Sequence, residues 1–97
     1  MFHKIKNVYS STNMTLTVEF VEGVTKKYDV KRLLKDFPVF AELKDDALFA
    51  SVKVDTGGYG IVWSEDLDLS CDELWENGKL IPTPFDGLIS FADTSKL

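Results

Sequence analysis

Seven consecutive residues near the N-terminus alternate strictly between apolar and polar side chains. The run Met-Thr-Leu-Thr-Val-Glu-Phe spans residues 14–20. Successive side chains of a β-strand point to opposite faces of a sheet, so this period of two predicts a strand with Met14, Leu16, Val18 and Phe20 facing the core. A strand with one buried face and one wet face is typical of an antiparallel sheet.

A turn around Gly23 returns the chain as a second strand, and the length of that turn decides which residues pair. A two-residue loop would set Val18 opposite Lys27 and place a charge on the core face. A three-residue loop over 22–24 sets Val18 opposite Tyr28 instead. Because a slip of one residue turns every side chain to the other face, we predict the three-residue loop, with Gly23 at a position of positive φ.

The strongest local signal for a helix begins at Ser70. The segment Ser-Cys-Asp-Glu is a capping box, in which the serine hydroxyl accepts from a backbone N–H of the first turn and the glutamate reaches back to the serine N–H. Leu69 and Leu74 occupy the two positions of a hydrophobic staple. We therefore predict a two-turn helix over about 71–77 that buries Leu74 or Trp75.

The remaining elements are predicted to be short. Strands are expected over 4–9, 52–54 and 61–63, a helix over 30–36 capped by Asp29, a helical turn capped by Asp45, and a glycine-rich hairpin loop over 55–60.

The chain length of 97 residues fits one domain. The predicted fold class is α+β: a small antiparallel sheet built from hairpins, with two or three short helices packed on it. We assign residues 1–78 to this domain and residues 79–97 to a C-terminal extension that packs on it. Within the extension, the apolar run 88–92 is expected to add an edge strand to the same domain or to pair with a second chain.

Charge is distributed unevenly along the chain. Lys and Arg outnumber Asp and Glu by seven to three in residues 1–35, whereas Asp and Glu outnumber them by eleven to two in residues 36–78. The formal net charge is −5. Phosphate contacts need positive surface, so we expect no direct nucleic-acid binding, and a small acidic protein suits a basic protein partner.

Residues for catalysis or metal binding are scarce. His3 is the single histidine and Cys71 the single cysteine, which argues against a nucleophile–base pair and against a zinc site. The alternating acids that begin at Asp66 lack the glycine and glutamate of a calcium loop. The glycine-rich loop lacks the Gly-Lys-Ser/Thr ending of a phosphate loop. We expect no enzyme activity, no cofactor and no metal.

The sequence also carries expectations about location. A single cysteine allows no internal disulfide, which favours a reducing compartment. No apolar run follows Met1, and no stretch approaches the about 20 apolar residues of a membrane span. We therefore expect a cytoplasmic protein.

A longer pattern of core and turn residues covers roughly residues 3–78. It runs Leu16-x-Val18-x-Phe20, Gly23, Tyr28-Asp29, Leu33-Leu34, Phe40-x-x-Leu43-x-Asp45, Phe49-x-x-Val52-x-Val54-Asp55, Gly60-x-x-Trp63 and Leu69-x-x-Asp72-x-Leu74-Trp75. This pattern resembles the small bacterial family called domain of unknown function 2442. The resemblance implies an α+β fold of antiparallel strands and short helices, and it carries over no catalytic residue.

The same resemblance suggests a setting for the protein. Some family members are fused to a helix-turn-helix domain, and others are encoded beside a second small family, domain of unknown function 4160, in an arrangement like a toxin–antitoxin pair. The function expected from sequence is therefore a protein-interaction or regulatory module, the antitoxin-like partner of a neighbouring small protein.

Two further readings remain open. The partner can be a second copy of the chain, and the alternative function is small-molecule binding in a pocket between sheet and helices. The residues expected on the ligand or partner surface are Lys27, Lys31, Arg32, Tyr59, Trp63 and Trp75.

Overall fold

The computed structural model describes residues 2–81. Its strands are β1 (Ile5–Ser11), β2 (Thr15–Phe20), β3 (Thr25–Asp29), β4 (Lys53–Val54), β5 (Gly60–Ser64), β6 (Leu67–Ser70) and β7 (Lys79–Ile81). Its helices are η1 (Val30–Leu33), η2 (Pro38–Lys44), α1 (Asp46–Ala50), η3 (Thr56–Gly58) and α2 (Cys71–Asn77), of which the η elements are 3₁₀ turns.

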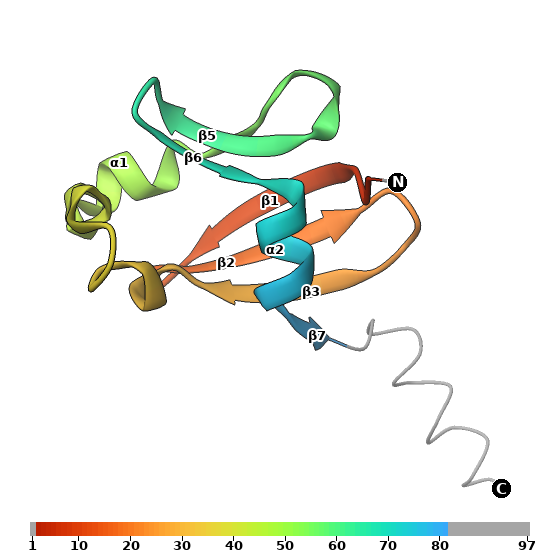
Figure 1. Ribbon diagram of the computed structural model, residues 1–97, viewed down its shortest axis with the longest axis horizontal. Coiled ribbons are helices and arrows are strands. Elements are labelled where there is room, and N and C mark those ends of the chain that lie inside the picture. The colour runs from red at the N-terminus through yellow and green to blue at the C-terminus, as the bar shows by residue number, and fades with distance from the viewer. Residues whose placement is uncertain (1, 82–97) are drawn as a thin grey trace, which may run out of the picture.

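Two antiparallel sheets form the framework of the fold (Figure 1). The first has the strand order β1-β2-β3-β7 and the second the order β4-β5-β6. Helix α2 follows β6 directly and lies against β3, so it links the two sheets. The predicted α+β class is confirmed, with two small sheets in place of the single expected one.

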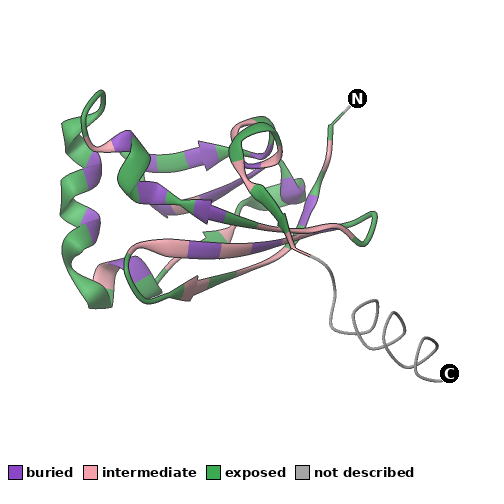
Figure 2. Cartoon of the chain, turned by 90° about the horizontal axis from the view of Figure 1, so that it is seen from below, coloured by how far each residue is buried: buried purple, intermediate pink, exposed green. Residues whose placement is uncertain are grey.

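Both sheets contribute to one hydrophobic core, shown in purple in Figure 2. Leu16, Val18 and Phe20 are at most 1% exposed, which confirms the predicted inward face of β2. Met14 is only half-buried, because it lies before β2 in the turn after β1 and has a φ of 54°.

The predicted pairing of Val18 with Tyr28 is wrong. Leu16 lies opposite Tyr28, and Val18 lies opposite Lys26. The loop has three residues, as expected, but it runs over 21–23. The pairing therefore shifts by two residues, and each side chain keeps the face that the alternation predicted.

Gly23 determines where this loop falls. Its φ of 94° places it as the third loop residue, the left-handed position that closes a three-residue hairpin loop after a type I turn. The Phe20 N–H donates to the Val24 carbonyl over 2.8 Å and closes the loop. The predicted positive φ of Gly23 is confirmed, but the loop begins one residue earlier than predicted, so Gly23 is its third residue and not its central one.

The observed register places Lys26 on the core-facing row of β3. Helix α2 compensates for this charge: the Lys26 ammonium lies 4.1 Å from the centroid of the Trp75 ring and donates to the Trp75 carbonyl. Carbonyls in the last turn of a helix lack helical partners and carry partial negative charge. Lys27 points to the opposite face and is exposed, as the sequence argument required.

Local capping signals predicted the short helices well. Asp29 accepts from the Lys31 N–H at 3.0 Å, and Asp45 accepts from the Ala47 N–H at 3.0 Å. The helix expected over 30–36 is shorter than predicted, a 3₁₀ turn over Val30–Leu33. Residues three apart eclipse in this geometry, so Val30 and Leu33 are both buried.

Helix α2 forms over the predicted residues. The Ser70 hydroxyl accepts from the Glu73 N–H at 3.1 Å. Leu69 is 9% exposed and Leu74 is fully buried, as expected for the staple.

Two strands were missed from the sequence. Strand β6 alternates buried Leu67 and Leu69 with exposed Asp68 and Ser70, a period of two that the acidic residues of this segment obscure. Strand β7, at the start of the expected extension, pairs with β3. The apolar run 88–92 lies outside the described residues.

Candidate functional site

The hydrophobic core opens to the surface between η1–η2 and β6. Leu33, Phe40 and Leu69 are among the least covered core residues, with 8%, 7% and 9% of their surface exposed. All three line one hollow of about 270 Å³. Phe37, which is 54% exposed, forms its rim. The hollow is thus an apolar surface that the described residues leave open to solvent.

Three polar residues complete the lining of this hollow: Asp68 and Ser70 from β6, and Glu73 from the first turn of α2. Asp68 and Ser70 are exposed, and Glu73 is half-buried. An apolar floor with carboxylates on one side suits a ligand that is itself apolar and basic.

Strand β6 also has an unpaired edge. It is the last strand of its sheet, paired only with β5 among the strands of the described chain. The Cys71 N–H donates to the Tyr59 carbonyl over 2.8 Å. In an antiparallel pair every second residue forms hydrogen bonds with the neighbouring strand, so Leu69, two residues earlier, is also hydrogen-bonded to β5. Asp68 and Ser70 alternate with these residues, and their backbone N–H groups point away from β5.

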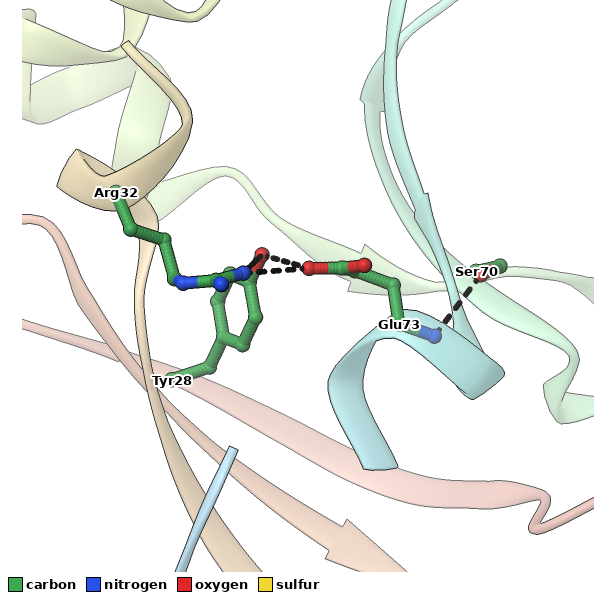
Figure 3. A network of polar contacts seen from close by, with 4 residues as sticks. All are labelled: Tyr28, Arg32, Ser70 and Glu73. Carbon is green, nitrogen blue, oxygen red and sulfur yellow. Dashed lines mark hydrogen bonds and ion pairs between the residues drawn. The ribbon is translucent and has the colours of Figure 1, made fainter. Parts of the chain in front are cut away.

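A polar network bridges α2 and η1 beside the hollow (Figure 3). The Tyr28 hydroxyl donates to Glu73 Oε2 over 2.6 Å. The Arg32 guanidinium donates to the same oxygen over 2.9 Å. The expected second half of the capping box is therefore absent, because the Glu73 side chain turns away from Ser70. It bonds instead to Arg32 and Tyr28, which lie 41 and 45 residues earlier in the chain.

Tyr28 acts in this network as a donor. Its side chain is fully buried. Burial, and then the hydrogen bond to Glu73, raises the pKa of Tyr28 well above its ordinary value. The hydroxyl therefore keeps its proton at neutral pH and offers no base or nucleophile. The network positions α2 against η1 and so sets one end of the hollow.

Of the basic residues expected on the ligand or partner surface, only two lie at the same hollow. Lys27 and Arg32 line a second hollow of about 330 Å³ together with Asp29, Asn77 and Lys79. Arg32 is engaged by Glu73, as described above.

Lys31 is engaged by other residues. Its ammonium pairs with Asp29 at 2.9 Å and donates to the Asn13 carbonyl over 2.6 Å.

The aromatic residues expected at the same surface are dispersed. Tyr59 is 47% exposed and packs edge-on against Phe2. Trp75 stacks on His3 with ring centroids 3.5 Å apart. Trp63 is only 8% exposed, and its indole N–H donates to the Phe49 carbonyl over 3.1 Å. Trp63 is therefore a core residue, which corrects its place in the expected surface.

The single histidine and the single cysteine of the chain contact different residues. His3 Nδ1 lies 2.7 Å from Glu22. Cys71 is buried, and burial, followed by the charge of Asp72, raises the pKa of its thiol. No group of three or more metal-ligating side chains occurs within residues 2–81. None of the helices described is long and apolar enough to cross a membrane.

The hollow beside β6 was not predicted from sequence. No local pattern in the sequence singles out Phe37, and Asp68 belongs to the series of alternating acids that begins at Asp66. The alternation of Leu67 and Leu69 with Asp68 and Ser70 is the signal that predicts the strand and its exposed face.

Fold and site together define a small two-sheet α+β domain with an open strand edge beside an apolar hollow. The family model described as "Protein of unknown function (DUF2442)" matches residues 5–79, and the chain belongs to this family. None of the curated proteins and none of the solved structures compared with the chain matches it.

Proposed function

We propose that this chain is a protein-interaction module whose contact surface is the hollow between η1–η2 and β6. The observation that carries the proposal is the opening of the core at this point: Leu33, Phe40 and Leu69 share one hollow, with Phe37 exposed at its rim. Apolar surface that is left open and rimmed by polar groups is a common mark of a protein contact.

The proposed partner is another small cytoplasmic protein. The acidic excess of residues 36–78, which include most of the hollow, favours a partner with a basic contact segment. The family resemblance points to the product of a neighbouring gene, for which this chain would serve as the antitoxin-like, regulatory half of a pair. This role requires binding and no catalysis, in agreement with the expectation that the protein is not an enzyme.

Small-molecule binding has weaker support. Of the three aromatic residues expected to line a pocket, Trp63 is in the core, and Tyr59 lines a hollow of only about 230 Å³. Pockets for small molecules usually enclose about 300–1,000 Å³. The hollow beside Lys27, of about 330 Å³, reaches this size, but it is lined by polar residues and not by the expected aromatic ones.

Co-expression with the product of the neighbouring gene tests the proposal. The chain carries an affinity tag, and the complex is measured by co-purification and by its mass in solution. The variant Phe37→Ser should reduce recovery of the partner, whereas Phe2→Ser, which removes a similarly exposed phenylalanine elsewhere, should leave it unchanged. A partner that does not co-purify, or that is recovered equally with both variants, contradicts the proposal.

A further inference from the structure

We infer that β6 binds its partner by strand addition: an extended segment pairs with the free edge of β6, inserts one apolar side chain into the hollow, and directs Lys or Arg toward Asp68. This inference rests on the proposed interaction function and specifies the binding mode and the chemistry of the partner.

The backbone of β6 provides the first argument. Because Leu69 bonds to β5, the Asp68 and Ser70 N–H groups face the open edge. Among the backbone hydrogen bonds of residues 2–81 that lie outside helices and strand ladders, none involves the Asp68 N–H or carbonyl. Four residues at about 3.3 Å each give an edge of about 13 Å, which is enough to pair with a short extended segment.

The side chains of β6 provide the second argument. Leu69 is on the buried face of β6 and Asp68 is on its exposed face. Both residues line the hollow, which therefore extends along the strand at this edge. A strand added to the same sheet alternates in the same way. One of its faces must therefore carry the apolar anchor, and the residues on either side of that anchor must face Asp68.

Charge identifies the partner segment. Glu73 already forms an ion pair with Arg32 and accepts a hydrogen bond from Tyr28. Asp68 has no ion pair within the described chain, and Asp66 and Asp72 flank it in sequence. A segment that alternates apolar and cationic residues satisfies both faces, whereas an acidic segment would place like charges together.

A designed peptide tests this inference without requiring an identified partner. The probe has seven residues with capped ends: Lys at its four odd positions, Phe at the centre and Thr at the other two positions. Binding to the full chain is measured by isothermal titration calorimetry. We expect this peptide to bind, and we expect the same peptide with Glu in place of Lys not to bind.

Backbone methylation of the peptide tests strand addition directly, and it leaves the protein unchanged. Only alternate N–H groups of an added strand face β6. N-methylation of one alternate set should abolish binding, and N-methylation of the other set should preserve it. Equal effects of the two sets would overturn strand addition, although the chain could still bind proteins through its side chains.

Protein variants then locate the site. Asp68→Asn should weaken peptide binding by about threefold, as expected for one exposed ion pair, and Phe37→Ser by about tenfold, because the apolar anchor loses a wall of its hollow. Asp46→Asn and Phe2→Ser remove the same groups elsewhere and should have no effect. Circular dichroism confirms that each variant is folded.

The outcomes separate this inference from the proposed function. If the neighbouring protein co-purifies and neither Asp68→Asn nor Phe37→Ser weakens its binding, the inference fails at this edge. If the chain alone forms a dimer that these variants dissociate, a second copy occupies β6, and the basic partner segment is wrong. If the neighbouring protein does not co-purify but the peptide binds as described, the edge is confirmed as a binding site and the proposed partner is wrong.

Discussion

The bond between Tyr28 and Glu73 should be the most important polar contact for the stability of this domain. The Tyr28 ring is fully buried, and its hydroxyl donates to the Glu73 carboxylate over 2.6 Å. A hydrogen bond to a charged group contributes about 1.5–3 kcal/mol. Removal of the hydroxyl by Tyr28→Phe should therefore lower the free energy of unfolding by about 2 kcal/mol.

Tyr9 offers a matched control. Its side chain is 51% exposed, and its hydroxyl lies 3.5 Å from Glu19, at the limit of a hydrogen bond. Tyr9→Phe removes the same atom and should change the free energy of unfolding by less than about 0.5 kcal/mol. Urea unfolding followed by tryptophan fluorescence measures both variants. At an m-value of about 1–2 kcal/mol per molar, the midpoint for Tyr28→Phe should fall by about 1–2 M.

A double-mutant cycle assigns the effect to this pair. Glu73→Ala should cost at least as much as Tyr28→Phe, because it leaves the buried hydroxyl without its acceptor and also removes the partner of Arg32. The two changes together should cost less than their sum, since they remove one shared bond. Equal midpoints for the Tyr28 and Tyr9 variants, or full additivity in the cycle, would refute this account of the network.

Three further measurements test other parts of the structure. Ser70→Ala should cost about 1 kcal/mol in urea unfolding, a usual loss for an N-cap, and an unchanged midpoint would argue against the observed start of α2. Gly58→Ala should destabilise the domain by about 2 kcal/mol more than Gly23→Ala. Both glycines have a positive φ, but a Cβ at Gly58 would lie 2.8 Å from the Ile5 carbonyl oxygen, whereas one at Gly23 would contact nothing; equal losses would show that this close approach is absent. Stability should also decline in alkaline solution, because the fold raises the pKa of Tyr28 and of the Cys71 thiol and so favours their protonated forms. This contribution is complete below the unfolded pKa values of about 8.5–10 and is lost as pH rises through the folded values, so unfolding curves that do not change between pH 8 and 11 would contradict it.

Signals confined to a few neighbouring residues predicted the structure well. The caps at Asp29, Asp45 and Ser70 and the alternation of β2 each act within one turn or one strand, so they can be recognised without knowledge of the rest of the fold. The first hairpin shows what such local signals cannot predict, namely the register of its two strands. Its loop length and faces were right, but its register depended on which loop position Gly23 occupies.

The candidate site could not be predicted because its parts come from distant segments. Leu33 and Phe40 meet Leu69 only after the second sheet packs on the first. Glu73 was expected to complete a capping box, a local role. Instead, the Glu73 carboxylate accepts from the buried Tyr28 hydroxyl, 45 residues away in the chain. A buried hydroxyl without an acceptor costs more free energy than an N–H at a helix start, which water can reach.

The features of β6 that disfavour pairing with a second copy also define what its edge can accept. An open strand edge beside an apolar hollow is a hazard for aggregation, and proteins commonly limit it with a short strand and exposed charge. β6 has only four residues, and Asp68 stands at its exposed face. Two copies with a net charge of −5 each repel one another. The same charge attracts a basic segment, so the protection against a second copy and the selection of a cationic partner follow from one acidic surface.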